Sequence, residues 1–241
     1  YFTEQTVEKE KGIIGQEIRM YDDNPDWRLF FGVIENMYHH HPVKIDIAGT
    51  VESIARITKD LLYTCYETFY HPSNMLLFVV GPVDPGEIIS LVKENQERKD
   101  YKAQPRIKRF FEEEPKEVAR VKKVLEMSVA TSKCMIAFKE KHPGRSGEEL
   151  LKHELAVNVL LDLMFSSSSE NYEALYDEGL IDDTFSFDYT EEDHFGFSMI
   201  GGDTKDPDGL EKRLLAMITE FKQQPLEEAA IERTKKKKIG L

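Results

Sequence analysis

The sequence has few cysteines and no long apolar run. Its only two cysteines, Cys65 and Cys134, lack CxxC spacing and give no sign of a disulfide framework. No apolar segment approaches the length of a membrane span, and no signal peptide is visible. We therefore expect two buried thiols in a reducing compartment, and we predict the cytoplasm of a bacterium as the location.

A basic charge balance is also absent. The 241 residues include 32 Lys and Arg against 45 Asp and Glu, a net charge of -13. This balance argues against nucleic acids and anionic membranes as partners and favours basic substrates. The one basic block, Lys235 to Lys238, is typical of a solvated helix end. The composition, 40% hydrophobic and 32% charged, is that of a folded protein with one large domain or two ordinary ones.

Common catalytic motifs are missing as well. The sequence contains no G-x-S-x-G and no phosphate loop, so a serine nucleophile is unsupported. His153 and Glu154 begin an H-E-x-x-H zinc motif, but Val157 replaces its second histidine. The three histidines at 39–41 are adjacent, so their side chains do not easily converge on one ion, and Pro42 marks a turn after them.

Hydrophobic periodicity predicts an α+β fold in two halves. Residues 1–103 and 118–241 flank a charged, proline-containing linker at 104–117. Strands are predicted at 75–81, 121–130, 133–140, 184–190 and 194–202, the last two as a hairpin with one buried face. Helices are predicted at 4–23, 26–38, 50–57, 58–70, 84–96, 147–165, 170–180 and 206–224, with another starting at 225. Thr50, Thr58 and Asp84 are the expected caps of the helices that they begin.

An internal echo supports two related halves. The segments 75–92 and 195–218 both run from a strand through a glycine and an Asp-Pro pair into an amphipathic helix. Such strand–turn–helix units are common, so chance similarity is the alternative to a true repeat.

The first predicted helix carries acids in its apolar stripe, which consists of Val7, Glu10, Ile14, Glu17 and Tyr21. Gly12 and Gly15 lie between the two glutamates. Each glycine costs a helix roughly 1 kcal/mol relative to alanine, which indicates a closely packed neighbour. Glutamates on such a face are rarely buried without a cation, a donor or a metal. The alternative is an exposed helix rich in Glu and Lys, as EKEK at 8–11 suggests.

Several stretches together resemble the insulinase–pitrilysin–mitochondrial processing peptidase family. The stretch VEKEKGIIGQEIRMYDDNP resembles the helix that carries the third zinc ligand of the family, with the form Glu, six residues, Glu. The following segment, from HPVKIDIAGTVESIARI to YHPSNMLLFVVGPVD, resembles a His-Pro loop, a short helix and a strand of the family. LLDLMFSSSSENYEALYDEGLI is similar to its helix, serine-rich loop and second helix. The similarity spans nearly the whole chain.

The resemblance implies site residues and a fold. Glu17 would be a zinc ligand, and Glu10 would support the metal ligands without touching the metal. The fold would be two related α/β-sandwich units, antiparallel-rich sheets covered by helices, both incomplete in this chain. The H-x-x-E-H motif of the family, which holds two histidine ligands and the general base, is absent from the sequence. Because the chain starts without Met and ends at KKKKIGL, we expect a fragment that is inactive alone and holds no zinc tightly.

Three hypotheses for the function remain open. The parent is a zinc metalloendopeptidase acting on peptides or unfolded proteins in a two-unit chamber, or a non-catalytic subunit that pairs with an active homologue, or a metal-free binding protein that shares the fold. We predict no nucleic-acid or membrane partner. A fragment that lacks neighbouring strands would expose apolar surface, so we also expect it to form oligomers.

Overall fold

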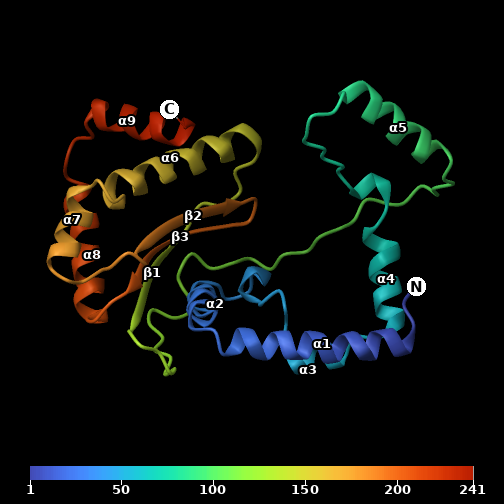
Figure 1. Ribbon diagram of the computed structural model, residues 1–241, viewed down its shortest axis with the longest axis horizontal. Coiled ribbons are helices and arrows are strands. Elements are labelled where there is room, and N and C mark those ends of the chain that lie inside the picture. The colour runs from blue at the N-terminus through green and yellow to red at the C-terminus, as the bar shows by residue number, and fades with distance from the viewer. Residues whose placement is uncertain (241) are drawn as a thin grey trace. The chain divides into compact units, whose positions relative to one another are not determined.

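The computed structural model describes residues 1–240, which form two compact units (Figure 1). The N-terminal unit comprises Tyr1–Ile18 and Ala48–Phe111. The C-terminal unit comprises Arg19–Ile47 and the residues from Glu112 onward. Residues 19–47 thus pack with the C-terminal half of the chain. The predicted division into 1–103, 104–117 and 118–241, as parts of two peptidase-like units, stays a prediction. In residues 1–240, no helix has both the length and the apolar character needed to cross a membrane.

The helices of the N-terminal unit begin where the sequence predicts. They are the first part of α1 (Glu4–Asp22), then α3 (Val51–Ala55), α4 (Lys59–Phe69) and α5 (Pro85–Glu97), with a 3-10 turn at Pro72–Asn74. The side chains of Thr50, Thr58 and Asp84 each accept a hydrogen bond from a backbone N–H in the first turn of the helix that follows. These bonds satisfy donors that a helix leaves unpaired at its start, so the predicted caps are confirmed.

Two predicted strands are not formed. The apolar segment 75–80 has no strand partner within residues 1–240, and its side chains are 48–88% exposed. A strand needs a neighbour for its backbone hydrogen bonds, and apolar character alone does not provide one. Residues 121–130 also form no strand. Cys65, expected to be buried, is exposed on α4, while Cys134 is half-buried.

A three-stranded antiparallel sheet forms the centre of the C-terminal unit. Its strands are β1 (Lys133–Lys139), β2 (Ser186–Glu192) and β3 (Phe195–Asp203). The order is β1-β3-β2, so β3 pairs on both edges, with Ile200 opposite Ile136 of β1 and Phe187 of β2. The predicted hairpin of β2 and β3 is confirmed.

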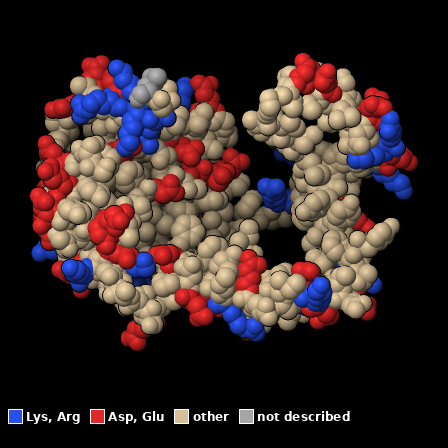
Figure 2. Space-filling view, viewed as in Figure 1, with Lys and Arg blue, Asp and Glu red and all other residues tan. Residues whose placement is uncertain are grey.

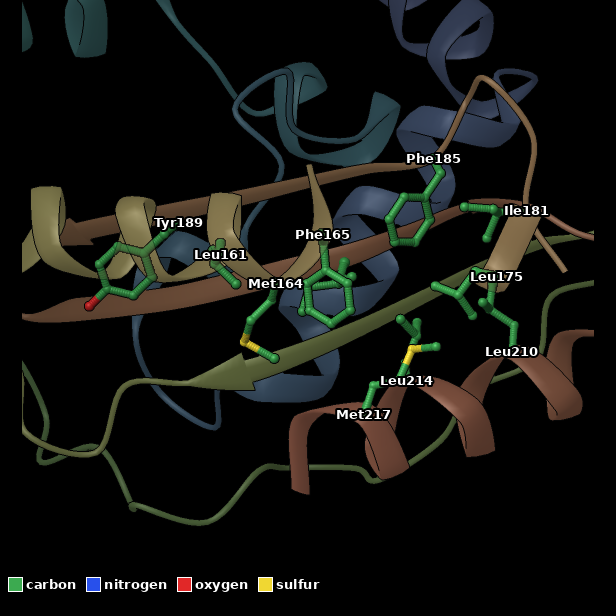
Figure 3. Packing of buried hydrophobic residues seen from close by; sticks show 11 residues of the cluster. Leu161, Met164, Phe165, Leu175, Ile181, Phe185, Tyr189, Leu210, Leu214 and Met217 are labelled. Carbon is green, nitrogen blue, oxygen red and sulfur yellow. The ribbon is translucent and has the colours of Figure 1, made fainter. Parts of the chain in front are cut away.

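Helices cover both faces of this sheet (Figure 1). They are α2 (Pro25–Met37), α6 (Gly147–Phe165), α7 (Glu170–Asp177) and α8 (Pro207–Phe221), while α9 (Glu228–Ile239) packs against α6. A buried cluster joins α6, α7 and α8 to one face, with Leu175, Leu210 and Leu214 fully buried (Figure 3). A second cluster joins α2 to the other face through Ile34, Met37, Tyr38, Phe197 and Met199.

Alternation along the strands explains these two cores. In β3, Ile200 contributes to the cluster with α6–α8, while Phe197 and Met199 contribute to the cluster with α2. The expectation of a hairpin with one buried face is therefore wrong for β3, because α2 covers its second face. The α+β class is confirmed, with one antiparallel sheet. The relation between two repeated units stays a prediction.

Gly201 provides a test of this packing. A Cβ atom at Gly201 would lie 2.0 Å from the backbone oxygen of Cys134 in β1. We expect Gly201→Ala to lower the free energy of unfolding by about 3 kcal/mol or more, since backbone must move to admit it. Chemical denaturation measures this change.

Gly32→Ala in α2 is the matched control. A Cβ atom there would meet only the Leu125 side chain, at an ordinary 3.6 Å. Alanine also favours helix by about 1 kcal/mol over glycine, so the stability should stay within about 1 kcal/mol of the original. Equal losses in the two variants would contradict the strand spacing described here.

Candidate functional site

Helix α1 carries both glutamates that the sequence singles out. Glu10 and Glu17 lie on the exposed side of the helix, two turns apart. Ile13 and Ile14 are also exposed there, by 49% and 36%. The adjoining side of the helix buries Val7, Gly15 and Ile18, so Val7 of the predicted stripe is buried while its two glutamates are exposed. The acids therefore share a face with apolar side chains, as the spacing predicts, and this face is exposed in the structure.

The two glycines of α1 differ in their surroundings. A Cβ atom at Gly15 would lie 3.8 Å from the Cδ1 atom of Ile54 in α3, whereas one at Gly12 would meet nothing within 4 Å. Among residues 1–240, no backbone of another element approaches either position this closely. The sequence predicts a closely packed neighbour at both glycines. At Gly15 this neighbour is the side chain of Ile54, and at Gly12 the described residues provide none.

Metal-ligating side chains do not come together in residues 1–240. Within residues 1–240, no three His, Cys, Asp or Glu side chains are arranged to hold a metal ion. The carboxylate of Glu17 is a suitable zinc donor, but a zinc site takes three or four ligands. Among the residues that the structure describes, Glu17 is therefore not part of such a set.

A buried charge cluster, which the sequence reasoning missed, lies at one end of the sheet. The side chain of Glu191 in β2 is fully buried. Its Oε1 atom accepts a 2.7 Å bond from Arg145, and its Oε2 atom lies 2.5 Å from Nδ1 of His153 and 2.9 Å from the Tyr189 hydroxyl. Arg145 also lies 3.9 Å from Glu140. His153 thus binds a carboxylate rather than completing a zinc motif.

The protonation of this cluster follows from its contacts. Burial opposes ionisation of Glu191, but the bonds from Arg145, Tyr189 and His153 outweigh it and hold the pKa of Glu191 below its usual range. Burial and the Glu191 charge raise the pKa of Tyr189. The cluster therefore contains an ionised carboxylate and a neutral phenol at neutral pH. A sequence signal for it existed, since Glu191 continues the alternation of Phe187 and Tyr189.

The lysine run belongs to α9 and is partly paired. Lys237 and Lys238 lie 2.9 and 3.3 Å from the carboxylate of Asp162 in α6, and Lys235 pairs with Glu232. Burial opposes ionisation of Asp162, but the two lysines outweigh it and lower its pKa. Figure 2 shows this group of basic side chains at α9. Lys237 and Lys238 thus form ion pairs that join α9 to α6, whereas the sequence predicts a run of lysines that is only solvated.

Comparison with known proteins identifies the family. The profile described as the peptidase M16 inactive domain matches residues 56–238. The chain belongs to the M16 peptidase family. The family predicted from the sequence is therefore confirmed. Residues 1–55, which carry Glu10 and Glu17, lie outside the matched segment.

Relatives of this M16 chain include proteins named as zinc proteases. The uncharacterized zinc protease YmfH of Bacillus subtilis is 62% identical over 240 residues, which cover all of this chain and 56% of YmfH. The uncharacterized zinc protease ML0855 of Mycobacterium leprae is 34% identical over 89 residues, 37% of this chain and 20% of that protein. The chain thus spans about half the length of its most extensive match here.

Solved M16-like structures share the fold. A putative M16-like peptidase from Alicyclobacillus acidocaldarius has a TM-score of 0.94 and 42% identity, covering all of this chain and 56% of that one. A protease from Helicobacter pylori has a TM-score of 0.84 at 20% identity, covering all of this chain and 58% of that one, and shows the fold alone.

The Glu191 cluster predicts a measurable pH dependence. We expect Glu191→Gln to lower the free energy of unfolding by about 3 kcal/mol at pH 7, because Arg145 and His153 lose their buried anion. Since the folded pKa of Glu191 is depressed, its stabilisation is present above the unfolded pKa of about 4.5 and is lost as the pH falls through the folded value. Chemical denaturation at several pH values between 7 and 3 should therefore show that the difference in unfolding free energy between the original chain and Glu191→Gln becomes smaller as the pH falls.

Glu192→Gln is the matched control, because Glu192 is the next residue and is exposed. Its effect should stay within about 0.5 kcal/mol. If Glu191→Gln is equally mild at pH 7, the buried cluster does not stabilise the unit.

Proposed function

We propose that this chain is part of a zinc-dependent metalloendopeptidase and that Glu17 supplies one zinc ligand. The observation that carries the proposal is the exposed face of α1, where Glu10 and Glu17 lie among exposed apolar side chains. A helix face with exposed apolar side chains favours coverage by another element. The M16 family and the relatives named as zinc proteases support this reading.

The contribution of this chain to such a site is limited. Bound zinc would polarise a peptide carbonyl and activate a water molecule. Glu17 would offer a carboxylate oxygen to the metal, and Glu10 would hold the ligands in position by hydrogen bonding. The two histidines and the general base of an H-x-x-E-H motif would come from residues outside this sequence. We propose that the chain alone is inactive and holds no zinc tightly.

The substrate proposal follows from charge and fold. We propose unfolded peptides as substrates, bound in a chamber between two units, where an extended peptide can pair with a sheet edge. The net charge of -13 favours basic peptides. Acidic side chains are widespread on the face drawn in Figure 2. The cytoplasmic location and bacterial origin stay predictions from the sequence.

A non-catalytic partner subunit is the second candidate. The matched profile is described as an inactive domain, which favours this candidate for residues 56–238. The presence of both Glu10 and Glu17 before that segment favours the peptidase. A metal-free binding protein is the third possibility, and it requires that Glu17 be irrelevant to zinc content.

Substitution of Glu17 in the full-length protein tests the proposal. We expect Glu17→Gln to remove most bound zinc and most hydrolysis of an unfolded peptide, since a zinc ligand is lost. Glu10→Gln should lower zinc affinity or activity by about 10–100-fold, the effect typical of a group that supports metal ligands. Zinc is measured by elemental analysis and hydrolysis by mass spectrometry.

Glu8→Gln is the control on the same helix, because Glu8 is exposed and pairs only locally with Lys11 in the contacts described. It should leave zinc content and activity unchanged. Full zinc content in Glu17→Gln would overturn the ligand assignment. A full-length protein without zinc or activity would favour the partner subunit.

The exposed apolar segment 75–80 predicts self-association of the isolated chain. Leu76 and Phe78 are 88% and 80% exposed, and such patches favour association. We expect light scattering to show a dimer or larger species at high concentration, and Leu76→Glu with Phe78→Glu to shift it toward monomer. Val121→Glu with Val124→Glu, at 92% and 77% exposed positions elsewhere, is the control. A monomeric original chain would refute the prediction.

A further inference from the structure

The triple-histidine loop binds a carboxylate through its backbone. Glu114 extends into the loop that follows α2, where its Oε1 atom accepts a 2.7 Å bond from the backbone N–H of His39. Its Oε2 atom accepts bonds of 2.7 and 2.8 Å from the N–H groups of His40 and His41. Three successive N–H groups that converge on one anion form a nest, a recognised anion-binding arrangement.

A buried lysine completes the site. The Nζ atom of Lys139, at the end of β1, donates a 2.6 Å bond to Oε1 of Glu114. It also donates to the backbone oxygens of Pro115 and Glu117, at 2.7 and 3.3 Å, and lies 4.8 Å from the ring centroid of Tyr38. The side chains of Lys139 and Glu114 are only 4% and 13% exposed. The carboxylate therefore joins three segments of the C-terminal unit.

The residues around Glu114 depend on few other contacts. Residues 101–114 have no helix or strand, and positions 115–119 contain only bends. Nearby support comes from Val118, which packs against the α2 cluster, and from the 2.8 Å bond of the Arg120 N–H to the Asn36 oxygen. Glu114 and Lys139 thus provide most of the polar attachment of residues 112–117, which we name the strap. The imidazole of His40, 3.2 Å from the carboxylate of Glu112, adds an exposed contact to it.

We propose that Glu114 is a latch that holds the strap closed, and that the nest of His39–His41 is a carboxylate-binding site able to take a small free carboxylate when the Glu114 side chain is removed. In this proposal the histidines bind Glu114 through their backbone N–H groups, so the latch itself does not need their imidazoles, although the imidazole of His40 also contacts Glu112. This accounts for a conspicuous motif that the proposed peptidase function does not use.

The latch should respond to acid. Burial opposes ionisation of Glu114, but the bonds from Lys139 and from the three histidine N–H groups outweigh it and lower its pKa to about 2. Because the folded pKa is depressed, the attachment is complete above the ordinary value of about 4.5 and weakens as the pH falls toward 2. The titratable and charged groups that face Glu114 are Lys139 on β1, Tyr38 after α2 and His41 on the loop.

Limited trypsin digestion of the 241-residue chain tests the proposal. Before the strap, Arg106, Lys108 and Arg109 lie in exposed chain without secondary structure, while Lys116 lies within the strap. We expect early cleavage in the original chain at the first group and resistance at Lys116. Glu114→Gln should raise the rate of cleavage at Lys116 about tenfold or more, since charge-assisted bonds are lost.

Two controls separate the latch from general loosening. Glu113→Gln changes the preceding, exposed glutamate, and His39→Ala keeps the backbone N–H that binds Glu114 while removing an imidazole. Both variants should be cleaved at Lys116 within about twofold of the original rate. Circular dichroism confirms folding, and if Glu114→Gln fails to fold, hydrogen exchange of the His39–His41 amides in the original chain should show protection falling below pH 4.5.

Adding free acetate to a variant without the Glu114 carboxylate tests whether the nest binds a carboxylate. In Glu114→Ala, sodium acetate should restore protection at Lys116, whereas sodium chloride at equal ionic strength should not. The proposal is overturned if Glu114→Gln leaves Lys116 resistant, if His39→Ala opens the strap as much as Glu114→Gln does, or if acetate has no effect beyond that of chloride.

Discussion

The central strand β3 is the constraint on which the C-terminal unit depends. It pairs with β1 and β2 on its two edges, and helices cover both of its faces. Close approach is built into its end, because Cβ atoms at Gly201 and Gly202 would lie 2.0 Å and 2.8 Å from neighbouring backbone. A residue enclosed on four sides leaves no room for compensation, so the positions of α2, α6, α7 and α8 follow from this strand.

Paired carboxylates supply a second kind of constraint in the same unit. Glu191, Glu114 and Asp162 are largely buried, and each joins segments far apart in the sequence through cations or backbone donors. In the described part of the chain, no buried side-chain nitrogen or oxygen atom lacks a hydrogen-bond partner. A buried carboxylate stabilises the fold only when all its partners are present. Removing one partner therefore lowers the free energy of unfolding by more than the intact group contributes to it. The acidity of the chain is thus partly structural.

Local patterns predicted most elements, and long-range pairing explains the failures. The caps at Thr50, Thr58 and Asp84 and the alternation of Phe187 and Tyr189 were sufficient, because these signals depend on neighbours in the sequence. The apolar run at 75–80 predicted a strand wrongly, since a strand requires a partner that periodicity cannot reveal. The buried role of Glu114 was equally invisible, because its partners lie about 75 residues away in the loop after α2.

The candidate site shows the same division between local and distant information. The spacing of Glu10 and Glu17 places them on one face of α1, and the structure agrees, but the sequence alone cannot supply the atoms that would face them. The account rests on Glu17 touching zinc in the complete protein. Anomalous diffraction at the zinc edge from crystals of the zinc-loaded full-length protein tests this directly. We expect a peak about 2.0–2.2 Å from a Glu17 carboxylate oxygen, with Glu10 beyond bonding distance. A zinc peak without Glu17 as ligand would contradict the account.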